Sequence, residues 1–301
     1  MKKTYKADGF PVVMGIVLFS SLALLGNGCS MVAPEHPETT GETQRHALHS
    51  DIVNDDYDIL VRVPPDYDNA SPTPYPVIFQ LDVQLGILDE FNVTAGHVSS
   101  LEEDGVIPST IVVGIGYPYA EGPGNGRMRD YTIPMENQSR TEGATGGSPA
   151  FYRFITNELI PFLQSRYPLA GPQGRALFGH SLGGLFAIYS FAQRDSSSPF
   201  GGFVAASPSL WFDGGTIYKY LDSLQLGHAT DTCRLFMTMG DLEGPAMNVY
   251  FDDFTSKLNA RGLPGVLFSW RNYETDHIGT ISPSFRDGLI YLFDNGLRGT
   301  P

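Results

Sequence analysis

The sequence GHSLGG at residues 179–184 is the feature that most constrains the fold of this chain. A strand-like run, residues 175–178, precedes it, and a helix-like run, residues 182–193, follows it. A serine at the apex of a sharp turn between a strand and a helix is the arrangement of a nucleophile elbow. The glycines around Ser181 leave room for a strained turn and for close approach of helix and strand. We therefore predict that Ser181 is a nucleophile, the alternative being an ordinary glycine turn in a β-α unit.

Strand-like and helix-like segments alternate along most of the chain and indicate its fold class. Apolar runs predict strands at residues 57–63, 76–81, 110–115, 175–178, 202–206, 235–239 and 265–270. Helical patterns occupy residues 85–101, 149–167, 182–193, 215–224, 248–261 and 283–295, and a loop is expected over residues 117–147. This alternation predicts βαβ units and a mostly parallel sheet with helices on both faces. Functional groups of such sheets collect beyond the carboxyl ends of the strands.

The amino terminus has the pattern of an export signal. Three lysines lie within the first six residues, an interrupted apolar stretch follows at residues 10–25, and small residues lead to Cys29. We expect residues 1–28 to be a signal peptide and a lipidated Cys29 to be the first mature residue, with plain secretion as the alternative. Residues 29–44 are rich in Pro, Glu and Thr, which predicts a flexible tether, and residues 45–297 form the predicted domain.

Charge and cysteine content exclude several classes of function. The formal net charge is −14, which argues against nucleic acid as a partner because phosphate binding needs clustered Lys and Arg. Only Cys233 accompanies Cys29, so cysteine-ligated metal sites are excluded by count and Cys233 is expected to be a buried strand residue. We expect no metal and no organic cofactor, and membrane contact only through a lipid anchor. The oligomeric state is left open.

A histidine that follows the elbow is needed to accept the proton of the serine. In nucleophile-elbow enzymes the chain order is serine, acid and then histidine. Only His228 and His277 follow Ser181. His228 precedes a predicted strand and would lie on the wrong edge of the sheet. His277 follows the last predicted strand, where a final loop could return to the serine, so we predict that His277 is the base rather than a surface loop residue.

Three carboxylates are candidates for the residue that orients the histidine. The strand at 235–239 is followed by Asp241 and Glu243, and Asp276 directly precedes His277. Glu243 ranks first because it lies further beyond the strand end than Asp241, so its carboxylate can reach further toward the histidine. Asp241 ranks second because it could instead cap a turn. Asp276 ranks third because neighbouring side chains usually point apart.

The surroundings of the nucleophile supply further candidates. One oxyanion donor would be the amide of Leu182, and another would come from the loop at residues 82–84, where spacing does not identify the amide. Trp211 could line a substrate pocket or simply pack. Arg129 could meet an acidic substrate group, although pairing with Asp130 is favoured.

Taken together, these segments resemble the putative-esterase family of α/β-hydrolases, in the branch of the siderophore (ferric enterobactin) esterases. The resemblance covers about residues 45–295. It rests on YPV and LD at 75–77 and 81–82, VGIGY at 113–117, RDYT at 129–132, GHSLGG at 179–184, SPSLW at 207–211 and ETDH at 274–277. It implies an α/β-hydrolase fold and a serine esterase that hydrolyses a carboxylic ester or lactone, with a siderophore trilactone as the specific substrate.

The same resemblance refines the site. The family's acid commonly lies three residues after a glycine, which here is Glu243 after Gly240, although some siderophore esterases work with a serine–histidine pair alone. The second oxyanion donor would be the amide of Gln84, in a loop where Val83 stands in place of the usual glycine. Two alternatives remain: an esterase that removes acetyl or feruloyl groups from a polysaccharide, and a non-catalytic binding module on the same fold.

Overall fold

The computed structural model describes residues 40–83, 89–118, 125–135, 145–195, 197–223 and 232–297. The predicted signal peptide, Cys29, Gln84 and His228 lie outside these residues. Among the helices of the described ranges, none has the length and apolar character needed to span a membrane.

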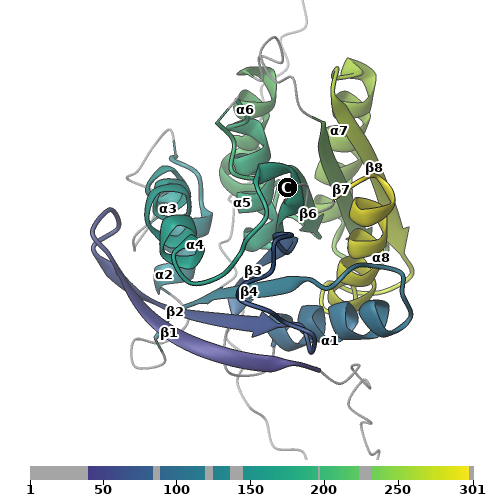
Figure 1. The fold of residues 1–301 in the computed structure, drawn as a ribbon. Coiled ribbons are helices and arrows are strands. Elements are labelled where there is room, and N and C mark those ends of the chain that lie inside the picture. The colour runs from purple at the N-terminus through teal and green to yellow at the C-terminus, as the bar shows by residue number, and fades with distance from the viewer. Residues whose placement is uncertain are drawn as a thin grey trace, which may run out of the picture. The chain divides into compact units, whose positions relative to one another are not determined.

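One mixed sheet of the described residues forms the centre of the domain (Figure 1). Its strands are β1 Glu42–Ser50, β2 Asp55–Val63, β3 Val77–Val83, β4 Ile111–Gly116, β5 Arg175–His180, β6 Gly202–Ala206, β7 Cys233–Gly240 and β8 Val266–Tyr273. Their order in the sheet is β1-β2-β4-β3-β5-β6-β7-β8. β2 is antiparallel to both of its neighbours, and every other neighbouring pair is parallel.

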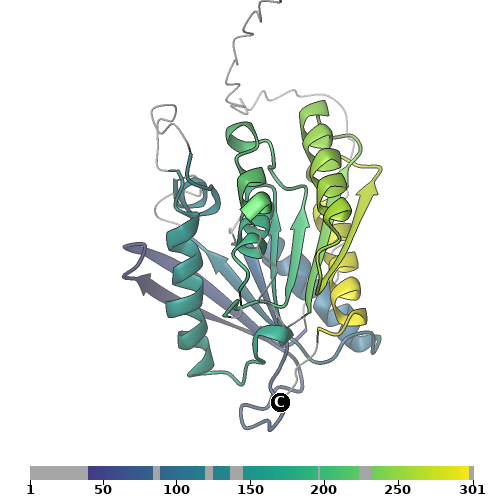
Figure 2. The same cartoon turned by 90° about the horizontal axis from the view of Figure 1, so that it is seen from above.

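Helices cover both faces of this sheet (Figure 2). They are α1 Glu90–Glu103, α2 Asn125–Tyr131, α3 Ser148–Phe154, α4 Ile160–Gln164, α5 Leu182–Ala192, α6 Ile217–Ser223, α7 Pro245–Arg261 and α8 Ile281–Asp294, with one π-helical segment, Ile155–Leu159, joining α3 to α4. α1 and α8 pack on one face with Ile78, Phe178 and Val204. α3, α5, α6 and α7 pack on the other face with the alternate strand residues. The two buried faces follow from the two-residue period of a strand.

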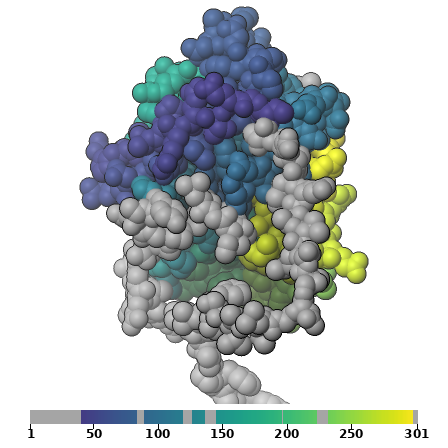
Figure 3. Space-filling model, turned by 90° about the horizontal axis from the view of Figure 1, so that it is seen from below, coloured from purple at the N-terminus to yellow at the C-terminus, as the bar shows by residue number. Residues whose placement is uncertain are grey.

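The mostly parallel sheet with helices on both faces was predicted and is confirmed, and the seven predicted strands lie within three residues of the observed bounds. Two expectations were wrong. Residues 42–44, assigned to the tether, belong to β1, a largely exposed strand that lies at the surface and is purple in Figure 3. Residues 125–131, assigned to the long loop, form helix α2.

Glycines allow α5 to approach the sheet closely at the elbow. A Cβ atom on Gly179 would lie 2.3 Å from the carbonyl oxygen of Gly183. A Cβ atom on Gly184 would lie 2.9 Å from the carbonyl oxygen of Ala206. Real Cβ atoms do not tolerate such contacts with backbone, so these positions require glycine and α5 begins directly against β5 and β6.

We expect Gly179→Ala to destabilise the domain by about 1–3 kcal/mol or more, because the added methyl group forces backbone apart in a packed core. Gly171→Ala is the matched control. Nothing lies within 4 Å of a Cβ at Gly171, its φ is −67°, and the expected change is within about 0.5 kcal/mol. The free energy of unfolding in urea measures both. Equal effects of the two substitutions would contradict the close approach of α5.

Candidate active site

Ser181 occupies a strained turn between β5 and α5. Its φ of 58° and ψ of −115° lie in a region that residues with a side chain rarely adopt. The Ser181 amide donates to the carbonyl of Ala206 at 2.9 Å, and the Ser181 carbonyl accepts from the amides of Leu185 and Ser209, each at 3.0 Å. Three hydrogen bonds from neighbouring elements therefore hold the turn, which has the geometry expected of a nucleophile elbow.

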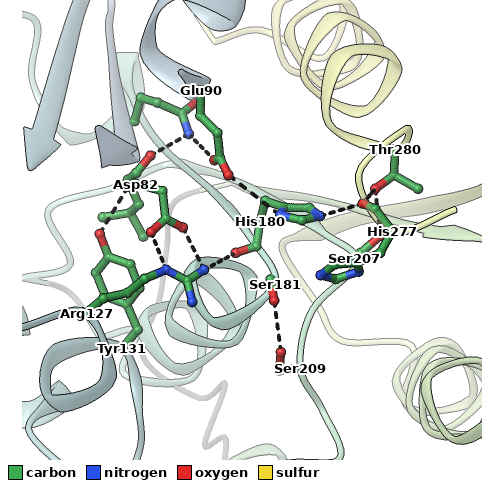
Figure 4. A network of polar contacts seen from close by, with 12 residues as sticks. Asp82, Glu90, Arg127, Tyr131, His180, Ser181, Ser207, Ser209, His277 and Thr280 are labelled. Atoms are coloured by element: carbon green, nitrogen blue, oxygen red, sulfur yellow. Dashed lines mark hydrogen bonds and ion pairs between the residues drawn. The ribbon is translucent and has the colours of Figure 1, made fainter. Parts of the chain in front are cut away.

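The hydroxyl of Ser181 lies at the carboxyl edge of the sheet, next to a backbone donor. Its Oγ is 3.4 Å from Oγ of Ser209, in the loop after β6 (Figure 4). Leu182 is the first residue of α5. The first amides of a helix have no partner inside the helix, so the Leu182 amide is available to an oxyanion that forms beside Ser181.

The predicted base and the first-ranked acid are in contact. Nδ1 of His277, in the loop between β8 and α8, lies 2.7 Å from Oε2 of Glu243, in the loop after β7. The other carboxylate oxygen of Glu243 accepts from Oγ of Ser207 at 2.5 Å and from the amide of Gly240 at 2.9 Å. Burial alone would raise the pKa of Glu243, but the hydrogen bonds from His277, Ser207 and Gly240 outweigh it and leave the pKa below its ordinary value. Glu243 is therefore a carboxylate, and Nδ1–H of His277 donates to it.

The two other candidate carboxylates have different partners. Oδ1 of Asp241 accepts from Nδ2 of Asn272 at 2.9 Å. Oδ1 of Asp276 accepts from the amide of Gly279 at 2.8 Å, inside its own turn. Of the three candidates, Glu243 is the one whose side chain contacts His277.

The last loop of the sheet returns to the elbow. The ring centroids of His277 and His180 are 4.4 Å apart, and His180 directly precedes Ser181. Among the hydrogen bonds of the described residues, Ser181 Oγ contacts Ser209 rather than the His277 ring. Such bonds between nucleophile and base are often long in a free enzyme and form when substrate binds. The arrangement therefore places the predicted base against the residue that precedes the predicted nucleophile.

Arg129 is occupied by two carboxylates. Its Nη1 lies 2.7 Å from Oδ2 of Asp55, and its Nε lies 2.6 Å from Oδ1 of Asp130. The pairing with Asp130 that the sequence favoured is present. A substrate contact would have to compete with both carboxylates.

Three exposed apolar side chains are close in sequence to candidate site residues. Trp211 is 46% exposed and lies two residues after Ser209. Leu242 precedes Glu243 and is 68% exposed, and Ile278 follows His277 and is 51% exposed. We refer to Trp211, Leu242 and Ile278, each within two residues of Ser209, Glu243 or His277 in the sequence, as the apolar rim. Such a rim suits an uncharged or aromatic portion of a substrate.

Sequence reasoning missed a partly buried ion pair next to the elbow. Nη2 of Arg127, on α2, lies 3.0 Å from Oδ2 of Asp82 at the end of β3. Burial opposes the charge of Arg127, yet Asp82 raises the pKa of this guanidinium above its ordinary value. The RDYT motif drew attention to Arg129, two residues further on. Among the described residues, no group of three or more His, Cys, Asp or Glu side chains is placed to hold a metal ion.

Cys233 is buried in β7, as predicted. Burial raises the pKa of its thiol to about 12, so the thiol stays protonated and unreactive.

Several proteins similar in sequence to this chain are named as esterases. BesA of Bacillus subtilis, a ferri-bacillibactin esterase, is 32% identical over 191 residues, which are 60% of this chain and 63% of BesA. A siderophore enterobactin esterase of Emericella nidulans is 36% identical over 118 residues, 36% of this chain and 38% of the relative. The chain therefore matches less than two thirds of the length of these curated relatives.

Solved structures share the fold. The BES protein from Bacillus cereus has a TM-score of 0.75 and 25% identity, over 86% of this chain and 99% of its own. An IroE-like serine hydrolase from Shewanella oneidensis has a TM-score of 0.71 and 26% identity, over 84% and 81% of the two chains. These likenesses confirm the predicted α/β-hydrolase fold.

A family model described as putative esterase matches residues 50–257, more than half of the chain. That match includes the elbow at Ser181 and the strand that leads to Glu243, while His277 lies beyond its end. With the fold and the relatives in agreement, the chain belongs to the putative esterase family of α/β-hydrolases.

Proposed function

We propose that this protein is a serine esterase that hydrolyses a carboxylic ester or lactone through an acyl-enzyme. The observation that carries the proposal is the 2.7 Å contact between Nδ1 of His277 and Oε2 of Glu243. The imidazole of the same His277 packs against the ring of His180, the residue before Ser181. A nucleophile, a base and a carboxylate that orients the base are the parts that acyl transfer requires.

The geometry supports a two-step reaction. Ser181 Oγ attacks the ester carbonyl while its proton passes to Nε2 of His277, and the charge of Glu243 stabilises the imidazolium that forms. The oxyanion of the tetrahedral intermediate is stabilised by the amide of Leu182 and, in our proposal, by that of Gln84. His277 then returns the proton to the leaving alcohol. A water molecule repeats the sequence on the acyl-enzyme and releases the acid.

Siderophore trilactones are the substrate class that we propose. The support is the similarity to esterases that act on ferri-bacillibactin and enterobactin. The apolar rim of Trp211, Leu242 and Ile278 can accept uncharged or aromatic parts of such a molecule. The formal net charge of −14 gives no help in attracting an anionic ferric complex, so these local contacts would carry recognition.

We expect Ser181→Ala to abolish ester hydrolysis, with a loss of roughly a thousandfold or more in kcat, because the substitution removes the proposed nucleophile. The assay is release of p-nitrophenol from p-nitrophenyl acetate, alongside cleavage of an enterobactin-type trilactone followed by mass spectrometry. Labelling of the native protein by a fluorophosphonate, absent in Ser181→Ala, checks the nucleophile independently.

The substrates separate the alternatives. Turnover of neither ester by the native protein would contradict the esterase proposal and favour a binding module. Turnover of the simple ester without the trilactone would reject the siderophore substrate and direct the assay to acetylated or feruloylated polysaccharides.

Glu243→Gln should lower kcat for p-nitrophenyl acetate by about 10²–10⁴, because a neutral amide cannot stabilise the imidazolium. Asp241→Asn is the matched control. Asp241 is exposed and contacts Asn272, so we expect this variant to stay within about twofold of the native kcat. A loss in Asp241→Asn with none in Glu243→Gln would reverse the assignment of the acid.

We also propose that the chain is exported and lipidated at Cys29. The support is the basic start, the apolar stretch at residues 10–25 and the small residues before the cysteine. Incorporation of labelled palmitate in cells, lost in Cys29→Ser, would test this. An unlabelled protein in the soluble fraction would favour secretion after cleavage without lipid.

A further inference from the structure

A chain of buried polar side chains contacts the backbone of His277, whereas Glu243 contacts its ring. It runs from Thr94 on α1 to Gln80 on β3, then to Glu90 at the start of α1 and to His180 at the end of β5. Figure 4 labels Glu90 and His180. Every one of these side chains is buried, with Glu90 1% and His180 2% exposed. The reaction described above uses none of them. Burying a polar group costs free energy unless the group finds a hydrogen-bond partner, so these side chains depend on one another for their hydrogen bonds.

The hydrogen bonds fix the direction of this chain of contacts. Thr94 Oγ1 donates to Oε1 of Gln80 at 2.7 Å, which orients the Gln80 amide. Nε2 of Gln80 then donates to Oε2 of Glu90 at 3.1 Å and to the carbonyl of Leu81 at 2.8 Å. Because Oε2 of Glu90 accepts, its other oxygen, Oε1, is left to face Nδ1 of His180, 3.6 Å away.

The tautomer of His180 follows from its other contact. Nε2 of His180 lies 2.8 Å from the backbone carbonyl of His277. A carbonyl can only accept, so Nε2 carries the proton, and Nδ1 of the neutral ring presents a lone pair to Glu90.

The surroundings of His180 and Glu90 favour the neutral form of each side chain. Burial, reinforced by the neighbouring His277, lowers the pKa of His180 to about 3. Burial, reinforced by the charge of Asp82, raises the pKa of Glu90 well above its ordinary value. The consistent arrangement is a protonated Glu90 whose Oε1–H points to Nδ1 of His180, and a His180 whose Nε2–H binds the main chain of His277.

We propose that Glu90 and His180 are positioning residues that hold the backbone of the catalytic His277, while Glu243 holds its ring. This inference rests on the proposed roles of Ser181 and His277. The carbonyl of His277 also accepts from Oγ1 of Thr280 at 2.7 Å, so two donors fix the peptide from which the imidazole extends. With the peptide and the ring both fixed, the direction of Nε2 is set before substrate arrives.

Neutrality of His180 matters for the chemistry. Its ring lies 4.4 Å from that of His277, which becomes a cation when it accepts the proton of Ser181. A second cation at this distance would oppose that step, as like charges do. The ionisable groups around His180 are Glu90 from α1, His277 itself, and Arg127 from α2, whose charge also disfavours a protonated His180.

The first test compares variants of His180 in steady-state kinetics with p-nitrophenyl acetate. His180→Ala removes the donor to the His277 carbonyl, so we expect kcat to fall by about 10- to 100-fold while KM changes less than about twofold. His180→Gln retains an amide donor and should recover most of kcat. The rate of fluorophosphonate labelling should follow kcat in both variants.

Variants of Glu90 test its protonation state. Glu90→Gln mimics a protonated carboxyl, since its oxygen can accept from Gln80 and its NH₂ can donate to His180. We expect it to keep most of kcat, whereas Glu90→Ala should lose about tenfold or more because the His180 ring loses the side chain that faces its Nδ1 and is held less firmly against the His277 carbonyl. Glu90→Gln as impaired as Glu90→Ala would overturn the neutral assignment.

Glu102→Ala is the matched control for stability. Glu102 also lies on α1 and forms an ion pair of 2.7 Å with the buried Arg62, so its loss should destabilise the domain without altering kcat. An equal loss of kcat in Glu102→Ala, or native kcat in His180→Ala, would overturn the proposal. Failure of the native protein to react with the fluorophosphonate would instead reject the esterase proposal.

The pH dependence of unfolding gives a readout that does not require activity. The folded-state pKa of His180, about 3, lies below its ordinary value of 6.5, so between these values the unfolded chain binds one more proton. Stability from this group is complete above pH 6.5 and is lost as pH falls toward 3. Relative to His180→Gln, the unfolding equilibrium constant of the native protein should rise by up to about tenfold per pH unit on acidification. If the unfolding equilibrium constants of the native protein and of His180→Gln changed equally with pH, that result would contradict a buried neutral His180.

Discussion

The backbone of Ser181 is held in a conformation that few residues with a side chain adopt, and the rest of the site is arranged around it. A φ of 58° with a ψ of −115° costs roughly 1–3 kcal/mol in backbone strain. The hydrogen bonds to Ala206, Leu185 and Ser209, and the packing of α5 on both neighbouring strands, offset that cost. Strain at this position keeps the hydroxyl beyond the sheet edge, where loops from other strands can reach it.

Two buried glutamates, one in contact with His277 and the other facing His180, have opposite protonation states. Glu243 accepts hydrogen bonds from His277, Ser207 and the Gly240 amide, and these interactions favour the carboxylate. Glu90 accepts from Gln80, and the charge of Asp82 lies beside it, so burial dominates and the acid form is favoured. Environment rather than residue type thus decides which glutamate can stabilise a developing imidazolium and which can donate a hydrogen bond.

Local pattern and chain order were enough to predict the sharp turn at Ser181 and the contact of Glu243 with His277, because an elbow and strand ends are visible in sequence. The sequence did not indicate that Glu90 is buried, since a glutamate in a helix looks the same in sequence whether tertiary packing buries it or not.

Helix α2 was predicted as a loop, and its two arginines show a further limit of prediction from the sequence. Arg127 and Arg129 are two residues apart on a helix and so face different sides, one toward Asp82 and the other toward Asp55 and Asp130. Strand β1 was missed because most of its residues are exposed and it lacks a strong apolar pattern.

The groups that hold His277 come from parts of the chain far apart in sequence. Gln80 lies on β3, Glu90 begins α1, His180 ends β5 and Glu243 follows β7. None of these contacts can form until β3, β5 and β7 are assembled in one sheet, so the reactive geometry is a property of the folded sheet and not of any local segment. The loops at the strand ends can therefore vary in the apolar groups that they offer a substrate while the imidazole keeps its direction. Because the contacts that hold the imidazole are separate from the loops that contact the substrate, one fold can retain its chemistry while its specificity changes.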